Sequence, residues 1–441
     1  MASAANLRHA ATVVVVRDAP AGLQLLLLQR AEKGDHNSGA WVFPGGLVDA
    51  ADRECHASCV GLDDAQASAR LRLPEGGLDA YVAAIRECFE EAGLLFAVDA
   101  HGQPIAPQAE LAARLAACRD ASQPGGPGLA ELCRANSLWL AVGQLHYIGH
   151  WVTPLGRAKR FDTRFFVAVL PPGQDSAHDA VETTDHVWLR PAVALSGANT
   201  RRLMTPTRAM IEQIAAFEDC AALLRWAALP RDVPCVLPRL GVGSGGLRPV
   251  LPDDPAWAEI GRLDPQGRGD VWCELRPGVP VRLSARVLRL TAADHAGNSY
   301  LVSAAAGEGC AVIDPATADE AHLDALLAAA PGPIRSIFLC ATGGARAAAA
   351  ARLRERTGAR VHGPAGGSAD TVLAGGQTSA PGAALYSVDA GASLQYLLVE
   401  ENTLFVGDAG CRPLPAALAV DWLAPGHGFL ARANPWAAQT P

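Results

Sequence analysis

Short apolar runs separated by turn residues dominate the first part of the chain. A β-branched run from Ala11 to Val16 is broken at Pro20-Ala21-Gly22, and an apolar run resumes over Gln24 to Leu28. Runs of this length, bounded by Pro and Gly, are typical of buried strands. Further strands are predicted near residues 138–148 and 163–170, and helices near residues 79–92, 108–119 and 207–228. This mixture predicts an α/β domain.

The pattern changes between about residues 229 and 284, where Pro and Gly are frequent and no periodicity is sustained. We interpret this segment as an interdomain connection with some strands. Strands and Ala-rich helices alternate again from residue 285, which predicts a second α/β domain. The predicted organisation is a first domain over residues 1–228, the connection over 229–284 and a second domain over 285–441. A length of 441 residues is sufficient for two or three domains.

Composition and charge exclude several classes of protein. Hydrophobic residues make up 50% of the chain and charged residues 19%, which excludes wholesale disorder. A net charge of −8 argues against a general nucleic-acid or anionic-membrane binder, because such a surface repels phosphate. No apolar run reaches the roughly 20 residues of a membrane helix. The 11 scattered cysteines suit reduced thiols, and no secretory signal is visible, so we expect a cytoplasmic protein.

Three carboxylates crowd one face of the helix predicted over residues 79–92, with Asp79 as its N-cap and Gly93 as its stop. They are Glu87, Glu90 and Glu91, at positions i, i+3 and i+4, and Arg86 directly precedes the first of them. Arg86 can pair with Glu90 at i+4. One interpretation is a solvated acidic face. The other is a site for Mg²⁺ or Mn²⁺, because crowded carboxylates repel one another unless a cation neutralises them.

Residues 86–94, Arg-Glu-Cys-Phe-Glu-Glu-Ala-Gly-Leu, resemble the second half of the Nudix hydrolase signature. The first half of that signature is a glycine, five residues, a glutamate and seven residues. Phe43-Pro44-Gly45-Gly46 resembles the strand and turn that open it, but about thirty extra residues separate Gly46 from the helix. The position eight residues before Arg86 is Leu78, so the glutamate of the first half is expected to be lost.

The insertion resembles the coenzyme A diphosphatase branch of the Nudix hydrolases. The similarity covers about residues 8–225 and continues through three further segments, His150 to Pro154, Arg160 to Phe166 and Glu182-x-x-Asp185-x-x-Trp188. Leu26 to Ala31, Gly39 and Phe43 to Gly46 resemble the coenzyme A recognition motif of this branch. Asp35 stands where that motif has an arginine, and an acid there would repel the 3′-phosphate of coenzyme A.

The resemblance implies a Nudix α/β/α sandwich that hydrolyses a diphosphate joining a nucleoside to another moiety, coenzyme A derivatives included. It implies that Mg²⁺ or Mn²⁺ is held by Glu87, Glu90 and Glu91, that one of them can act as base, and that Arg86 orients them. Glu182 is a candidate additional carboxylate. The candidate substrate-binding residues are Arg30, Gly45, Gly46, Arg160 and Arg164. The alternatives are a surface cation for Arg30 and pairing with Asp162 for the other two arginines.

From about residue 285 the chain resembles the metallo-β-lactamase fold, an αββα sandwich. The similarity lies in residues 297–302, 311–315, 404–408 and 425–428. The four ligand positions of that fold's His-x-His-x-Asp-His loop fall on Ala341, Gly343, Ala345 and Arg346, which leaves Asp408 and His427. A catalytic zinc needs at least three protein ligands, so we expect no zinc. The domain is then a binding, dimerising or regulatory module.

The predicted function is therefore a Mg²⁺- or Mn²⁺-dependent hydrolase of a small-molecule nucleoside diphosphate derivative. No nucleic-acid or membrane partner is expected, and a homo-oligomer stays open. The alternative is a catalytically degenerate scaffold or ligand sensor. The joint presence of Arg86, the three glutamates and Gly93 favours the enzyme.

Overall fold

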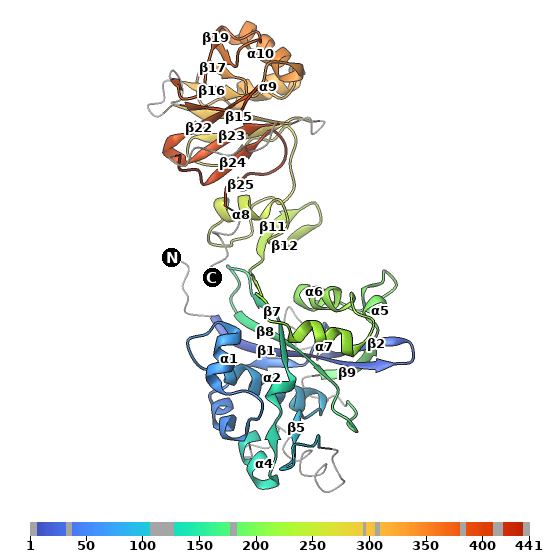
Figure 1. Ribbon diagram of the computed structural model, residues 1–441. Coiled ribbons are helices and arrows are strands. Elements are labelled where there is room, and N and C mark those ends of the chain that lie inside the picture. The colour runs from blue at the N-terminus through green and yellow to red at the C-terminus, as the bar shows by residue number, and fades with distance from the viewer. Residues whose placement is uncertain are drawn as a thin grey trace. The chain divides into compact units, whose positions relative to one another are not determined.

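The computed structural model of the chain describes residues 7–31, 38–105, 128–176, 183–293, 297–304, 309–379, 385–408 and 418–434. These residues divide into two compact units (Figure 1). The first unit contains residues 2–153 and 157–237, and the second contains residues 154–156 and the chain from residue 238 onward. The predicted domain limits at residues 228 and 285 stay predictions. No helix in the described ranges is both long and apolar enough to span a lipid bilayer.

A mixed sheet of eight strands forms the centre of the first unit. Its order is β10-β7-β8-β1-β2-β3, with β4 paired to β1 and β9 paired to β2. Its strands are β1 (Leu7–Ala19), β2 (Gly22–Arg30), β3 (Trp41–Val42), β4 (Gly45–Leu47), β7 (His146–Val152), β8 (Arg160–Val169), β9 (Thr183–Leu189) and β10 (Cys235–Val236). A separate two-stranded sheet is formed by β5 (Ala97–Val98) and β6 (Trp139–Leu140).

Helices cover both faces of this sheet (Figure 1). Helix α2 (Gly77–Ala92) packs its apolar side on Ala11, Val13 and Val15 of β1, in one buried core. Helices α6 (Thr205–Ile214) and α7 (Cys220–Ala228) lie on the opposite face. The remaining helices of the unit are η2 (Ala50–Ser58), α1 (Asp64–Leu71), α4 (Leu129–Asn136), η3 (Val142–Gln144) and α5 (Pro191–Leu195). Helix α2 is therefore supported along its length by the central sheet.

The elements predicted from apolar patterning are largely confirmed in this unit. The apolar run from Ala11 to Val16 lies in β1 and the run from Gln24 to Leu28 lies in β2. The run near 163–170 lies in β8. The run near 138–148 is divided among β6, η3 and β7. The helix predicted over 207–228 is two helices, because the Asp219 side chain accepts a hydrogen bond from the Ala222 amide and starts α7 anew. The helix predicted over 108–119 lies outside the described residues.

The second unit contains two facing sheets. The seven-stranded sheet runs in chain order through β13 (Val281–Arg282), β14 (Val287–Thr291), β15 (Asn298–Ser303), β16 (Cys310–Ile313), β17 (Ile334–Phe338), β18 (Arg360–Gly363) and β19 (Thr371–Val372). The six-stranded sheet runs through β20 (Thr378–Ser379), β21 (Leu385–Asp389), β22 (Leu394–Leu398), β23 (Thr403–Gly407), β24 (Trp422–Pro425) and β25 (Ala431–Arg432). The 3₁₀ turn η4 (Val399–Glu401) precedes β23.

The second unit has two hydrophobic cores, one between its two sheets and one beneath its helices. Aromatic side chains of both sheets share the inner core, namely Tyr300, Phe338, Tyr396 and Phe405. Helices α9 (Glu320–Ala329) and α10 (Gly344–Thr357) pack on the outer face of the seven-stranded sheet through Leu323, Leu326, Ala350 and Leu353. The predicted connection also contains ordered elements, namely the hairpin of β11 (Arg239–Gly243) and β12 (Gly246–Val250), followed by α8 (Trp257–Leu263).

Candidate active site

The start of β4 brings two glycines against helix α2. The Gly45 amide donates a hydrogen bond to Glu91 Oε2 at 3.0 Å. A Cβ at Gly46 would lie 2.4 Å from Cδ of Glu87, and one at Gly45 would lie 2.4 Å from Oγ1 of Thr12. Gly45 has no room for a side chain because backbone atoms of β1 face it, whereas a Cβ at Gly46 would force the Glu87 carboxylate to move. Two of the predicted carboxylates thus lie directly beside the predicted glycine turn.

The Gly46→Ala variant is expected to lose kcat by about tenfold or more, because its methyl group displaces the Glu87 carboxylate, and small misplacements of a reacting group are costly. Steady-state kinetics measured beside a melting curve check this. The matched control is Gly128→Ala, whose Cβ would meet nothing within 4 Å. A Gly46→Ala enzyme with wild-type kcat would contradict this packing.

Arg86 links helix α2 to two other segments. Its Nε donates to Oδ1 of Asp52 at 2.7 Å and its Nη2 donates to Oδ2 of Asp52 at 3.2 Å, which is a bidentate pair. Nη2 also donates to the carbonyl oxygen of Leu47 at 2.8 Å. Burial lowers the pKa of Arg86, but the hydrogen bond to Asp52 and the neighbouring carboxylates raise the pKa by more. The guanidinium therefore stays charged and fixes the end of β4 to the helix.

The glutamate of the first half of the signature is absent, as predicted, but an acid, Asp52, stands at the spacing of the signature from Gly46. It follows Gly46 after five residues, which is the spacing of the signature, with aspartate in place of glutamate. Its side chain is 1% exposed and also accepts a hydrogen bond from the Asp49 amide at 2.8 Å. Leu78 is instead an apolar core residue. The insertion follows the acid, so counting backward from Arg86 reached the wrong position, whereas counting forward from Gly46 reaches the right one.

The carboxylates of Glu87 and Glu90 are joined by one nitrogen of Arg86. Nη1 of Arg86 donates to Glu87 Oε1 at 2.8 Å and to Glu90 Oε2 at 3.2 Å. The predicted i, i+4 pair between Arg86 and Glu90 is confirmed. The Glu87 side chain is 13% exposed and that of Glu90 is 40% exposed, so the cluster is open to solvent on the Glu90 side.

The donor set of the three glutamates suits a hard divalent cation, because it offers only carboxylate oxygens. At present these oxygens are engaged by Arg86 and by the Gly45 amide. Among the described residues, no three His, Cys, Asp or Glu side chains stand close enough together to hold a metal ion. The residues therefore fit Mg²⁺ or Mn²⁺ by their chemistry, and binding requires their carboxylates to turn away from these donors.

Helix α2 begins two residues earlier than predicted, and Asp79 is not its N-cap. The cap is Gly76, and the free amides of the first turn are bound by the insertion. Asp64 accepts from the Gly76 and Leu78 amides at 3.0 and 2.9 Å, and Ser68 Oγ accepts from the Gly77 amide at 2.9 Å. Asp79 pairs with His56 at 2.6 Å instead. The predicted stop at Gly93 is confirmed, with φ at 71°.

The predicted substrate arginines lie in different surroundings. Arg30 ends β2 and is partly exposed, and Arg160 begins β8 and donates from Nε to the Thr153 carbonyl at 3.1 Å. Arg164 is 5% exposed and pairs with Asp162, the alternative left open by the sequence. His150 Nε2 lies 2.6 Å from Asp162 Oδ1 and 2.7 Å from Arg164 Nη1. Glu182 and Asp35 lie outside the described residues.

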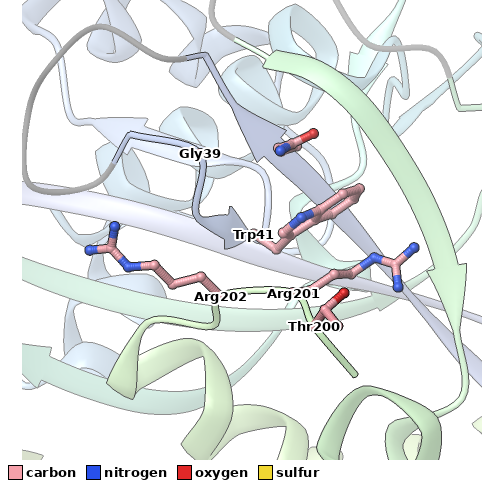
Figure 2. Close-up of a pocket in the computed structure, with 6 residues that line it drawn as sticks. Gly39, Trp41, Thr200, Arg201 and Arg202 are labelled. Atoms are coloured by element: carbon pink, nitrogen blue, oxygen red, sulfur yellow. The ribbon is translucent and has the colours of Figure 1, made fainter. Parts of the chain in front are cut away.

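A cavity of about 380 Å³ lies where the chain enters β3 (Figure 2). It is lined by Gln29, Gly39, Trp41, Thr200, Arg201 and Arg202. The two arginines were not among the predicted site residues. They belong to the irregular segment between α5 and α6, where no motif or periodicity singles them out.

Arg346 occupies the predicted zinc position in the second unit. Its guanidinium donates to both Asp408 carboxylate oxygens, at 3.0 and 2.7 Å. It also donates to the backbone carbonyls of Asn298, Asp314 and Gly426 at 3.0, 2.9 and 3.2 Å. Arg346 is 9% exposed. A fixed positive charge therefore neutralises Asp408 where the related fold would hold a metal.

We expect the purified protein to carry no stoichiometric zinc in this unit, because Ala341, Gly343 and Ala345 offer no donor and Arg346 repels a cation. Elemental analysis checks the metal content. His427→Ala is expected to leave hydrolysis nearly unchanged, since its Nε2 pairs with Asp408 at 3.3 Å in the second unit and it is not part of the carboxylate cluster of α2. One or two zinc ions per chain, lost on mutating His427, would overturn this expectation.

Comparison with known families identifies the first unit. Residues 58–209 match the family model described as the NUDT19 Nudix domain. The first unit contains a Nudix domain. The chain is 28% identical over 281 residues to human acyl-coenzyme A diphosphatase NUDT19, covering 54% of this chain and 73% of that protein. The predicted resemblance to the coenzyme A diphosphatase branch, and with it the predicted class of Nudix-type hydrolase, is confirmed.

Solved structures resemble each unit separately. For the Nudix domain, a Nudix hydrolase from Alicyclobacillus acidocaldarius is 26% identical with a TM-score of 0.42, covering 51% of this chain and 99% of that chain. For the second unit, the BLEG-1 B3 metallo-β-lactamase is 15% identical with a TM-score of 0.27, covering 33% of this chain and 92% of that chain. The predicted α/β fold class is confirmed by the layers of the two units, a sheet covered by helices on both faces in the first and two facing sheets with outer helices in the second.

Proposed function

We propose that the Nudix domain hydrolyses the diphosphate of a nucleoside diphosphate linked to another moiety, with coenzyme A derivatives as the leading substrates. The observation that carries this proposal is the convergence of Glu87, Glu90 and Glu91 on Arg86 and the Gly45–Gly46 turn. The activity named for the human relative, an acyl-coenzyme A diphosphatase, supports the substrate class.

We propose Glu87, Glu90 and Glu91 as the ligands of Mg²⁺ or Mn²⁺. Such a cation, when bound, polarises phosphate oxygens and lowers the pKa of a bound water. A diphosphate brought close to three carboxylates is repelled unless positive charge is present, and Arg86 alone supplies one charge against three. Any one of the three glutamates can act as the base.

The chain itself keeps the carboxylates in place. Arg86 holds Glu87 and Glu90 on one side, and is held in turn by the buried Asp52. The Gly45 amide holds Glu91 on the other side. This support favours an enzyme over a degenerate scaffold, because a relaxed site has no need of a bidentate buried pair behind its acidic residues.

Other residues extend the proposal. Glu182 is proposed as an additional acid, since Thr183 next to it donates to the Glu91 carbonyl at 3.4 Å. Arg30 and Arg160 are proposed as phosphate contacts. The nine described cysteines are free thiols, which supports the proposed location in the reducing cytoplasm. Whether the chain forms a homo-oligomer is left open.

The second unit is proposed as a non-catalytic binding, dimerising or regulatory module. The observation that favours this is the guanidinium of Arg346, which uses its donors on Asp408 and on three backbone carbonyls. A site filled in this way leaves no position for a metal-bound water.

The test is a hydrolysis screen of the full chain against coenzyme A, acyl-coenzyme A, ADP-ribose and a dinucleotide, with Mg²⁺ or Mn²⁺. We expect release of two phosphate monoesters, loss of turnover on adding EDTA and recovery on restoring the cation. A chain that cleaves none of these with either cation would overturn the proposal and favour the scaffold.

A further inference from the structure

The cavity beside β3 is built from two segments far apart in the sequence. The Trp41 amide donates to the Arg202 carbonyl at 2.9 Å, so the segment around Arg202 lies against β3. Asn199 Oδ1 accepts a hydrogen bond from the Arg201 amide at 3.2 Å and shapes this segment further. These backbone contacts hold two consecutive arginines at the cavity.

The two arginine side chains leave this segment in different directions (Figure 2). Arg201 lies over the Trp41 ring, with its guanidinium carbon 4.9 Å from the ring centroid, which fixes the cation by a cation–π contact. Arg202 extends on the Gly39 side and is exposed. The cavity wall therefore carries one fixed guanidinium and one that is open to solvent.

The charge of the cavity selects for an anion. Among the described residues, its lining includes two arginines, the amide of Gln29 and the hydroxyl of Thr200, and no aspartate or glutamate. Nε of Arg201 is buried and has no hydrogen-bond acceptor among the described residues. In the part of the chain that the structure describes, Nη1 of Arg201 has a long contact of 3.5 Å to Asn199 Oδ1. Guanidinium donors of this kind match phosphate oxygens.

The cavity is linked to the carboxylates of α2 through the short segment from Trp41 to Gly45. Trp41 precedes Gly45 by four residues, and a stretch of four residues spans at most about 14 Å. Gly45 itself contacts Glu91. A phosphorylated nucleoside attached to the diphosphate that is cleaved can bridge this distance.

We propose that the cavity of Arg201 and Arg202 binds a phosphate monoester on the nucleoside part of the substrate, distinct from the diphosphate that is hydrolysed. This rests on the proposed function for its substrate class. Coenzyme A carries such a phosphate monoester, its 3′-phosphate. Arg201 and Arg202 supply the positive charge for this phosphate from the segment between α5 and α6.

The first experiment measures binding to the full chain by calorimetry, without turnover. The probes are adenosine 3′,5′-bisphosphate, adenosine 5′-monophosphate and inorganic phosphate. We expect the bisphosphate to bind about tenfold or more tightly than the other two, as one charge-assisted phosphate contact allows. In the Arg201→Gln and Arg202→Gln variants, the ratio between the dissociation constants of the other two probes and that of the bisphosphate should fall toward one.

The matched control is Arg208→Gln, an exposed arginine on the neighbouring helix α6 that lies 3.9 Å from Glu212 and outside the cavity. It should keep the preference for the bisphosphate. Because Arg201 packs on Trp41, its variant is checked by a melting curve, and the exposed Arg202 provides the test if Arg201→Gln fails to fold. Equal binding of all three probes, or an unchanged preference in both variants, overturns the subsite.

The second experiment separates this subsite from the proposed function. The ratio of kcat/KM for coenzyme A to that for its form without the 3′-phosphate should fall about tenfold in Arg202→Gln. If the chain cleaves no diphosphate yet shows the arginine-dependent preference in binding, the proposed function fails and the subsite stands. If coenzyme A is cleaved and the ratio is unchanged in both variants, the subsite fails and the function stands.

Discussion

Glu91→Gln is expected to lower kcat by about 100-fold or more, because it removes one negative charge from the proposed cation site without removing volume. Glu91 is 5% exposed, and its carboxylate accepts the Gly45 amide. A glutamine oxygen can still accept this hydrogen bond, so the fold should lose no more than about 1 kcal/mol. Turnover and chemical denaturation of the same preparation measure the two effects.

Glu212→Gln is the matched control for this prediction. Glu212 is an exposed glutamate of α6, and its side chain is 56% exposed. The same chemical change there should leave both kcat and stability within error of the wild type, since an exposed ion pair contributes little. A Glu91→Gln enzyme with wild-type kcat would show that Glu91 has no part in the reaction.

Arg346→Met is expected to destabilise the second unit by about 3 kcal/mol, because it removes the charged hydrogen bonds to three backbone carbonyls and the pair with the half-exposed Asp408. Arg346 also lies in the first turn of α10, where the helix dipole disfavours a cation, so Asp408 is needed to hold it. Denaturant unfolding, followed through the tryptophans of each unit, measures the loss.

Arg352→Met on the same helix is the control. Arg352 is 52% exposed and pairs with Glu320 and Glu355 at the surface. Its loss should cost less than about 0.5 kcal/mol. If Arg346→Met unfolded at the same denaturant concentration as Arg352→Met, the guanidinium would not be the element that closes the predicted zinc position.

Local spacing made the carboxylate part of the site predictable. Glu87, Glu90 and Glu91 share a helix face, and Arg86 reaches Glu90, because residues three and four apart are neighbours on any α-helix. The stop at Gly93 follows from the same local geometry, since glycine readily adopts the left-handed conformation there. These features need no knowledge of distant contacts.

Features that depend on distant segments were not predictable in the same way. Asp52 meets Arg86 across an insertion of variable length, so its place depends on where the insertion begins. Arg201 and Arg202 approach Trp41 only through the fold of the whole first unit. In the second unit the sequence indicated missing ligands at Ala341 and Gly343, but the closing of the position by Arg346 depends on its approach to the end of β23.

The central claim is that the carboxylates of α2 hydrolyse a diphosphate, and phosphorus NMR of the best substrate from the screen tests it most directly. With the wild-type chain and Mg²⁺ or Mn²⁺, we predict that the diphosphate resonances disappear and two monoester resonances replace them. The Glu91→Gln chain should leave the diphosphate resonances in place over the same time. Equal cleavage by both chains would contradict the account.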